Sequence, residues 1–112
     1  MDKVTIKKAR LDQTDKINEI VSKTIKEIYP KYYLNEIVDF FLELHNYNNI
    51  NNDILKGNTY VIGCEATILG TGTMNQNAIS RVYITPNNQH KGIGTKLMDY
   101  LEKEIIKNYS YV

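Results

Sequence analysis

The segment Gln89–Thr95 constrains this chain most, because it places two glycines between a predicted strand and a predicted helix. The apolar run Ile79–Ile84 predicts the strand, and apolar residues at helical spacing from about Gly94 onward predict the helix. A helix that begins in a glycine-containing turn presents unpaired backbone N–H groups and the positive end of its dipole. Such a turn is either an ordinary helix start or an anion site, and Gly-x-Gly alone does not decide between them.

Two well-known phosphate loops do not fit this segment. The Walker pattern requires a glycine, any four residues and then Gly-Lys-Ser/Thr, which the chain lacks. The dinucleotide fingerprint requires a third glycine where Leu97 stands. The segment therefore remains a candidate for binding a phosphate through backbone amides, with Lys91 as an added positive charge.

Hydrophobic periodicity predicts a strand and two helices in the first half of the chain. Alternation over Val4–Ala9 predicts the strand. The first helix ends at Pro30, and Asp12 with Asp15 resembles its capping box. The second helix begins at Asn35 as its cap and ends in the Asn-rich run 46–52. Its apolar set consists of Ile37, Val38, Phe40, Phe41 and Leu44.

Strands dominate the second half. Tyr60–Ile62 and Thr67–Leu69 predict a hairpin, and we expect Gly70 and Gly72 to weaken or bulge its second strand. The glycine segment's strand and helix follow, and residues 109–112 have the pattern of a strand beginning. The predicted order β-α-α-β-β-β-α corresponds to an α/β (α+β) fold.

Composition limits the classes of partner. The net charge is +1, from 14 basic and 13 acidic residues, which argues against nucleic acid or an anionic membrane. The single cysteine, Cys64, cannot form an intramolecular disulfide, and no leader or membrane-spanning apolar run is present. We therefore expect a cytoplasmic protein with one domain over residues 1–112. Because Cys64, His45 and His90 are too scattered for a zinc site, we expect no metal.

The residues around the glycine segment resemble the coenzyme A motif of the GNAT superfamily of N-acetyltransferases. Gln89-x-x-Gly92-x-Gly94 has the form of that motif, with Arg81–Pro86 before it and Lys96–Met98 after it. Further segments that look like one bacterial branch of the superfamily are Tyr29–Tyr33, Val38–Phe41 and Gly70–Gly72. The resemblance covers essentially the whole chain and implies a mixed, mainly antiparallel sheet flanked by helices.

The resemblance implies acetyl-coenzyme A as co-substrate and direct transfer of its acetyl group to a primary amine of a small molecule or peptide. A backbone N–H on the strand would stabilise the oxyanion, and a general acid would protonate the leaving thiolate. The strand residues that would pair with the pantetheine arm are Val82, Tyr83 and Ile84. Those that would hold the pyrophosphate are Gln89, His90, Lys91, Gly92, Ile93, Gly94 and Thr95. Those that would line the acceptor side are Tyr32, Tyr33 and Phe41.

The chain departs from the family pattern in two respects. Family members commonly carry a carboxylate that acts as the base on the strand before the motif, whereas residues 78–85 contain none, so the base is unassigned. His45, late on the second predicted helix, is either a candidate base or a boundary residue of that helix. Family members also continue with a strand, a helix and a closing hairpin, so we expect an incomplete domain whose open sheet edge pairs with a second copy. The alternatives are a non-catalytic coenzyme A-binding module or degenerate fragment, and an interaction protein. Arg81 and Lys96 are either solvated charges or phosphate contacts, and Cys64 is structural.

Overall fold

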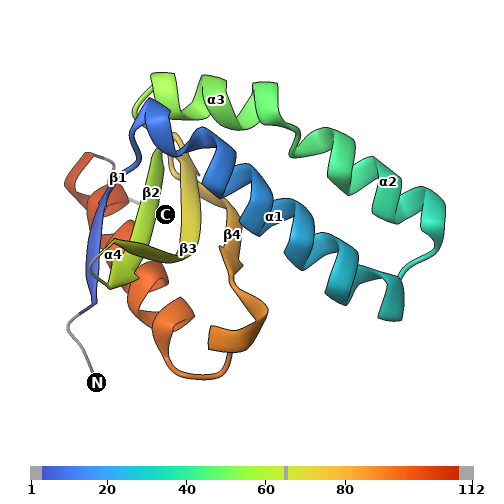
Figure 1. Ribbon diagram of the computed structural model, residues 1–112. Coiled ribbons are helices and arrows are strands. Elements are labelled where there is room, and N and C mark those ends of the chain that lie inside the picture. The colour runs from blue at the N-terminus through green and yellow to red at the C-terminus, as the bar shows by residue number, and fades with distance from the viewer. Residues whose placement is uncertain (1–3, 65, 109–112) are drawn as a thin grey trace.

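The computed structural model describes residues 4–64 and 66–108, which form a four-stranded antiparallel sheet with helices on both faces. The elements in chain order are β1 Thr5–Lys8, α1 Thr14–Ile28, α2 Asn35–Leu44, α3 Tyr47–Leu55, β2 Thr59–Cys64, β3 Thr67–Asn75, β4 Ala78–Ile84 and α4 Ile93–Asn108. The sheet order β1-β2-β3-β4 makes β1 and β4 the two edges. Figure 1 shows α1 in front of the sheet with α2 and α3 beside it, and α4 behind.

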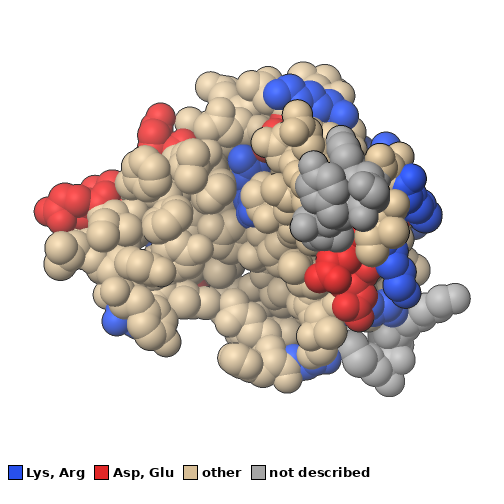
Figure 2. All heavy atoms as spheres, turned by 180° about the vertical axis from the view of Figure 1, so that it is seen from behind, with Lys and Arg blue, Asp and Glu red and all other residues tan. Residues whose placement is uncertain are grey.

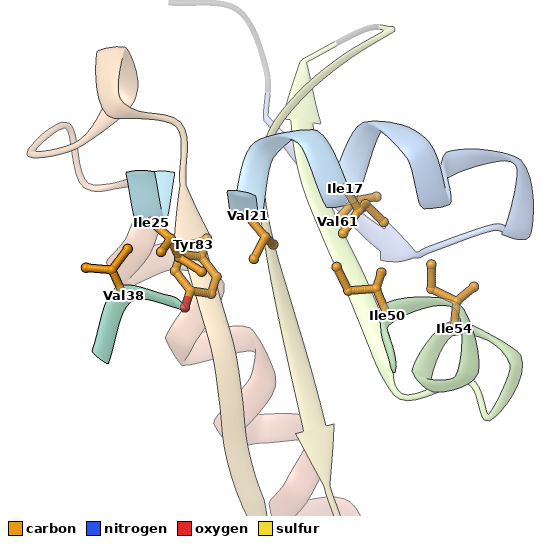
Figure 3. Packing of buried hydrophobic residues seen from close by; sticks show 8 residues of the cluster. All are labelled: Ile17, Val21, Ile25, Val38, Ile50, Ile54, Val61 and Tyr83. Atoms are coloured by element: carbon orange, nitrogen blue, oxygen red, sulfur yellow. The ribbon is translucent and has the colours of Figure 1, made fainter. Parts of the chain in front are cut away.

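The alternating side chains of the strands divide the core into two halves. In β2, Val61 packs on the α1 side, whereas Tyr60 and Ile62 pack on the α4 side. Tyr83 and Ile84 in β4 divide in the same way. Figure 3 shows the α1 half, in which helices and strands contribute Ile17, Val21, Ile25, Val38, Ile50, Ile54, Val61 and Tyr83. The predicted α+β fold is confirmed, and every strand pairing in the described ranges is antiparallel.

The Asn-rich run forms the helix α3, so the prediction that helical structure ends there is wrong. The side chain of Asn46 caps this helix by accepting a hydrogen bond from the Asn49 N–H at 2.9 Å. Ile50 and Ile54, four residues apart, are both buried in the α1 half of the core. Burial of this apolar pair offsets the poor helix propensity of asparagine. The element order is therefore β-α-α-α-β-β-β-α.

The start of α1 differs from the predicted capping box. Asp12 and Asp15 do not cap it; instead, the Gln13 side chain accepts a hydrogen bond from the Arg10 N–H at 2.8 Å. Asp12 forms an exposed ion pair with Arg10 at 3.1 Å. A short 3-10 turn, Leu11–Gln13, precedes the helix and moves its first residue to Thr14.

α2 is only shallowly attached to the core. It begins at Asn35, but the cap position is held by Leu34, so Asn35 is not the predicted cap. Val38 is buried, whereas three other members of its apolar set are exposed: Ile37, Phe40 and Leu44.

In Figure 2, large uncharged areas cover the middle of the molecule seen from behind, and most charged side chains stand around its outline.

β3 runs through both of its glycines, and the predicted bulge lies next to the first of them, because Gly70 pairs with Ile62 of β2 whereas Ile68 pairs with the adjacent Gly63. The pairing with β4 shifts register between Thr71 and Thr73. A Cβ on Gly72 would lie 2.7 Å from Leu101 Cδ1, so the glycine allows α4 to pack closely on the sheet. The strand predicted to begin in residues 109–112 lies outside the described residues. No helix within 4–64 or 66–108 is long and apolar enough to cross a membrane.

Candidate functional site

The connection between β4 and α4 contains two residues with left-handed backbone. His90 has φ +65° and Gly92 has φ +83°. Glycine adopts this conformation readily, whereas it is uncommon for other residues. The Gln89 side chain ties the connection to the strand, since its Nε2 donates a hydrogen bond to the Ile84 carbonyl at 3.0 Å. This hydrogen bond holds the start of the predicted loop at the C-terminal end of β4.

The first turn of α4 has open backbone N–H groups. In the part of the chain that the structure describes, none of residues 90–95 donates a backbone hydrogen bond, and the series begins with Lys96 N–H to the Gly92 carbonyl at 3.1 Å. A Cβ placed on Gly92 would meet no atom within 4 Å, so the space beside it is open. Open amides at the positive end of a helix dipole are what a phosphate group requires.

β4 presents its outer edge beside this turn. The Thr85 N–H donates to the Leu69 carbonyl at 2.9 Å. Backbone groups alternate sides along an antiparallel ladder, so the N–H and C=O of Ile84 point away from β3. The Ile84 carbonyl accepts a hydrogen bond from the Gln89 side chain, which leaves the Ile84 N–H as an open donor on the outer edge. Among the described strands, none pairs with this edge.

A β-bulge deforms β4 three residues before its end. Residues 81 and 82 lie opposite the single residue 72, because the register shifts between Thr71 and Thr73. Arg81 has φ +48°, a left-handed backbone that is uncommon for a residue with a side chain. The bulge allows this side chain to reach α2 and α3.

Arg81 joins three elements in a partly buried network. Its Nη1 forms an ion pair with Asp53 Oδ2 from α3, and its Nε donates a hydrogen bond to His45 Nδ1 at 2.9 Å. The Arg81 side chain is only 9% exposed, and that of Asp53 is 23% exposed. The interpretation of Arg81 as a solvated charge is therefore wrong, since a buried guanidinium needs such partners.

Sequence reasoning missed Asp53 because it directly follows the Asn-rich run 46–52, in which the second helix was expected to end. Two signals in the sequence point to the helix: an asparagine cap at Asn46 and the four-residue spacing of Ile50 and Ile54. A helix from Tyr47 onward places Asp53 on α3, whose contact with β4 through Arg81 appears only in the folded chain.

The hydrogen bond from Arg81 determines which nitrogen of the His45 ring carries the proton. A guanidinium has only donors, so Nδ1 of the imidazole is the acceptor and Nε2 carries the proton. Burial and then the charge of Arg81 lower the pKa of His45 from 6.5 to about 4, against an opposing effect of Asp53. The ring also stacks on Phe41, with centroids 6.5 Å apart. At neutral pH His45 is a neutral donor, and this arrangement disfavours it as a general base.

Aromatic side chains fill the space between α1, α2 and β4. The hydroxyl groups of Tyr29 and Tyr83 lie 3.1 Å apart, and burial followed by this hydrogen bond raises the pKa of Tyr83. The rings of Tyr33 and Phe41, both predicted to line the acceptor side, lie 6.0 Å apart, and both contact Tyr29. Tyr32, the third predicted residue, is 75% exposed. The structure thus brings two of the three together and leaves Tyr32 at the surface.

The remaining candidates lie apart from this network. His90 and Lys91 are exposed in the β4–α4 connection. The Lys96 ammonium donates to the Val4 carbonyl at 3.2 Å, near the start of β1. Cys64 is half-buried at the end of β2. Within the described ranges, no group of three or more His, Cys, Asp or Glu side chains is placed to hold a metal ion.

A polar pocket of about 390 Å³ opens next to the Arg81 network. It lies where the end of α2, α3 and the first half of β4 meet. The polar residues that line it include His45, Asn52, Asp53, Lys56, Ser80 and Arg81. Neither Asp53 nor Lys56 was a candidate from the sequence.

Comparisons with known proteins agree on one family. Residues 28–112 match the family model described as an acetyltransferase (GNAT) domain. No curated protein matches the chain.

Solved structures share the fold at low sequence identity. PaiA N-acetyltransferase from Thermoplasma acidophilum, crystallised with coenzyme A, is 20% identical with a TM-score of 0.78, over 95% of this chain and 74% of that one. A GCN5-related N-acetyltransferase from Rhodopseudomonas palustris is 17% identical with a TM-score of 0.82, over 96% and 69%. A possible acetyltransferase from Clostridium difficile 630 is 20% identical with a TM-score of 0.67, over 97% and 75%.

Proposed function

Because the chain belongs to the GNAT acetyltransferase family, whose model matches residues 28–112, we propose that it transfers the acetyl group of acetyl-coenzyme A directly to a primary amine of a small molecule or peptide. The observation that carries this proposal is the β4–α4 connection. Left-handed backbone at His90 and Gly92 and the open N–H groups of residues 90–95 lie directly after an edge strand. The similar fold of PaiA was crystallised with coenzyme A, which supports the same ligand here.

The residues present fit coenzyme A at two places. The pyrophosphate would accept hydrogen bonds from the open amides of residues 90–95, in the space left by the absent side chain of Gly92. The amides of the pantetheine arm would pair with the outer edge of Val82–Ile84, as an added strand does. Both contacts use backbone groups, so they depend on conformation more than on side-chain identity.

The proposed reaction is a direct displacement. The amine nitrogen attacks the thioester carbonyl carbon, the carbon–sulfur bond breaks, the amine loses a proton and the sulfur gains one. An alkyl amine has a pKa of ~10, so it must lose a proton before attack. A backbone N–H of β4 beside the thioester would stabilise the oxyanion as it forms.

The titratable side chains beside β4 are poorly suited to be the general base, and the Asp53 carboxylate is held in an ion pair with Arg81. β4 carries no carboxylate. The Nδ1 lone pair of His45 accepts the hydrogen bond from Arg81, so it is not available to take a proton. The Tyr83 phenol stays protonated because its pKa is raised. These observations leave deprotonation to solvent. They also favour a second candidate function, a coenzyme A-binding module that transfers no acetyl group.

Two measurements separate the candidates. Calorimetry with acetyl-coenzyme A tests binding, and release of the coenzyme A thiol in the presence of amines tests transfer. Binding with amine-dependent release supports the enzyme, and binding without release supports the module. Absence of binding at high ligand concentration would overturn both proposals.

We also propose that the chain forms a homodimer through the outer edge of β4. An unpaired edge strand is a template for pairing with another chain. Exposed apolar side chains on the neighbouring α2, namely Ile37, Phe40 and Leu44, add surface that a second copy would cover.

A further inference from the structure

We propose that the pocket between α2, α3 and β4 binds the carboxylate of the acceptor, so that the preferred acceptor is an amine that also carries a carboxylate, such as a free amino acid. This inference rests on the proposed acetyl transfer, because it names the substrate class of that reaction. The evidence consists of the charge of the pocket, its open hydrogen-bond donors and its position along β4.

The pocket carries a net positive charge. Its titratable lining residues are His45, Asp53, Lys56 and Arg81. His45 is neutral at pH 7, and the ion pair of Asp53 with Arg81 balances two charges. Lys56 is exposed and forms no ion pair with any described residue, so its charge remains. One carboxylate neutralises this excess, whereas a second cation would be repelled.

Arg81 and His45 each have a hydrogen-bond donor that no described residue accepts from. Arg81 uses Nε for His45 and Nη1 for Asp53, while its Nη2 has no partner in the described part of the chain. The one buried side-chain polar atom without a partner there is Thr24 Oγ1, so Arg81 Nη2 and the His45 Nε2–H both reach accessible space. A planar guanidinium edge recognises a carboxylate with good geometry, and a neutral imidazole N–H adds a second donor.

The pocket lies where the acetyl group would arrive. The β4–α4 connection is at the C-terminal end of β4, while Ser80 and Arg81 line the pocket farther back on the same strand. With a rise of about 3.3 Å per residue, the bulge is roughly 10 Å from Ile84. A pantetheine arm paired along Val82–Ile84 would therefore run from the pyrophosphate site toward the bulge. A carboxylate held at Arg81 would keep the attached amine near the thioester, which favours attack through proximity.

The first test compares acids with their amides as acceptors. Glycine, leucine and lysine are each assayed against the corresponding carboxamide, with kcat/KM for thiol release as the readout. We expect each acid to be preferred by about tenfold or more. Lys56→Glu should reduce this ratio about fivefold or more, because it replaces the unbalanced positive charge with a negative one. The matched control is Lys103→Glu, an exposed position on α4, which should keep the ratio.

The second test needs no activity. The ring signals of His45, assigned by their loss in His45→Gln, are followed by NMR while the chain is titrated with glycine, glycinamide or phosphoethanolamine. We expect glycine to shift these signals with saturation, and Lys56→Glu to abolish the shift. Equal shifts with glycinamide would overturn the inference, and tighter binding of phosphoethanolamine than of glycine would overturn the carboxylate in favour of a phosphate.

The two proposals fail in different ways. If acetyl-coenzyme A binds and amines are acetylated without preference for the acids, only the carboxylate site is overturned. If acetyl-coenzyme A does not bind, the proposed function is overturned, and the His45 titration still decides whether the pocket binds a carboxylate.

Discussion

Gly92 and Gly57 share a left-handed backbone, with φ of +83° and +75°, but they lie in different surroundings. A Cβ on Gly57, just after α3, would lie 3.6 Å from Lys8 Nζ. A Cβ on Gly92 would project into the open space beside the amides of the β4–α4 connection. The same substitution at these two positions therefore separates backbone strain from ligand binding.

Gly92→Ala and Gly57→Ala should each destabilise the fold by about 1 kcal/mol, because alanine resists a positive φ. Only Gly92→Ala should also lower the affinity for acetyl-coenzyme A, by about tenfold or more, since its methyl group occupies the proposed phosphate site. Urea unfolding and calorimetry measure the two effects. Equal affinities in the two variants would contradict the assignment of the connection as the pyrophosphate site.

His45 gives the fold a dependence on pH of known sign. Its pKa is about 4 in the folded chain against the ordinary value of 6.5, so between these values the unfolded chain binds more protons. Its contribution is fully present above pH 6.5 and is lost as the pH falls toward 4. Because the ring is partly solvated, we expect a loss of roughly 1–2 kcal/mol.

Urea unfolding at about pH 7 and about pH 4.5 measures this loss, with His45→Gln as the comparison. Carboxylates titrate in the same range, and the difference between the native chain and the variant removes their contribution. The variant should show the shallower dependence. Identical slopes would mean that His45 does not carry the effect.

At the scale of elements, α3 shows how packing overrides local propensity. Its sequence is rich in asparagine, a poor helix former, yet the cap at Asn46 and the buried pair Ile50 and Ile54 hold the helix against α1. The helix in turn places Asp53 against Arg81. Stability of this element is therefore a condition for the pocket.

Ile50→Ala should destabilise the chain by about 2–4 kcal/mol, because Ile50 is fully buried and its truncation leaves a cavity. Leu55→Ala in the same helix removes a side chain that is 61% exposed, and it should change stability by less than about 0.5 kcal/mol. Urea unfolding compares the two. A large loss from Leu55→Ala together with a small one from Ile50→Ala would mean that α3 packs differently.

At the scale of the whole molecule, the outer edge of β4 is shared by two proposals. Coenzyme A would pair with it, and so would a second copy of the chain. One edge cannot serve both at once, so ligand binding and self-association are linked through mass action.

Sedimentation velocity should therefore show a dimer that grows with protein concentration and dissociates when coenzyme A is added. Addition of free adenine is a control that lacks the pantetheine arm and should leave the dimer intact. A monomer at every concentration would contradict the homodimer, and a dimer unaffected by bound coenzyme A would place the interface on another surface.

Much of this architecture was readable from sequence alone. Periodicity of apolar residues located the strands and three of the four helices, because side chains must alternate on strands and recur at helical spacing on helices. The pattern Gln89-x-x-Gly92-x-Gly94 between a strand and a helix pointed to the family that residues 28–112 match. These features are local, so the order of residues is sufficient to predict them.

Only the tertiary structure decided how distant segments meet. Asp53, Arg81 and His45 lie far apart in the chain, and a bulge and two helices bring them together. Arg81 is buried and His45 neutral for that reason, and no residue spacing encodes either property. The sequence determined the loop proposed to hold coenzyme A through local backbone chemistry, whereas the acceptor-side pocket arises from contacts between elements and therefore required the fold.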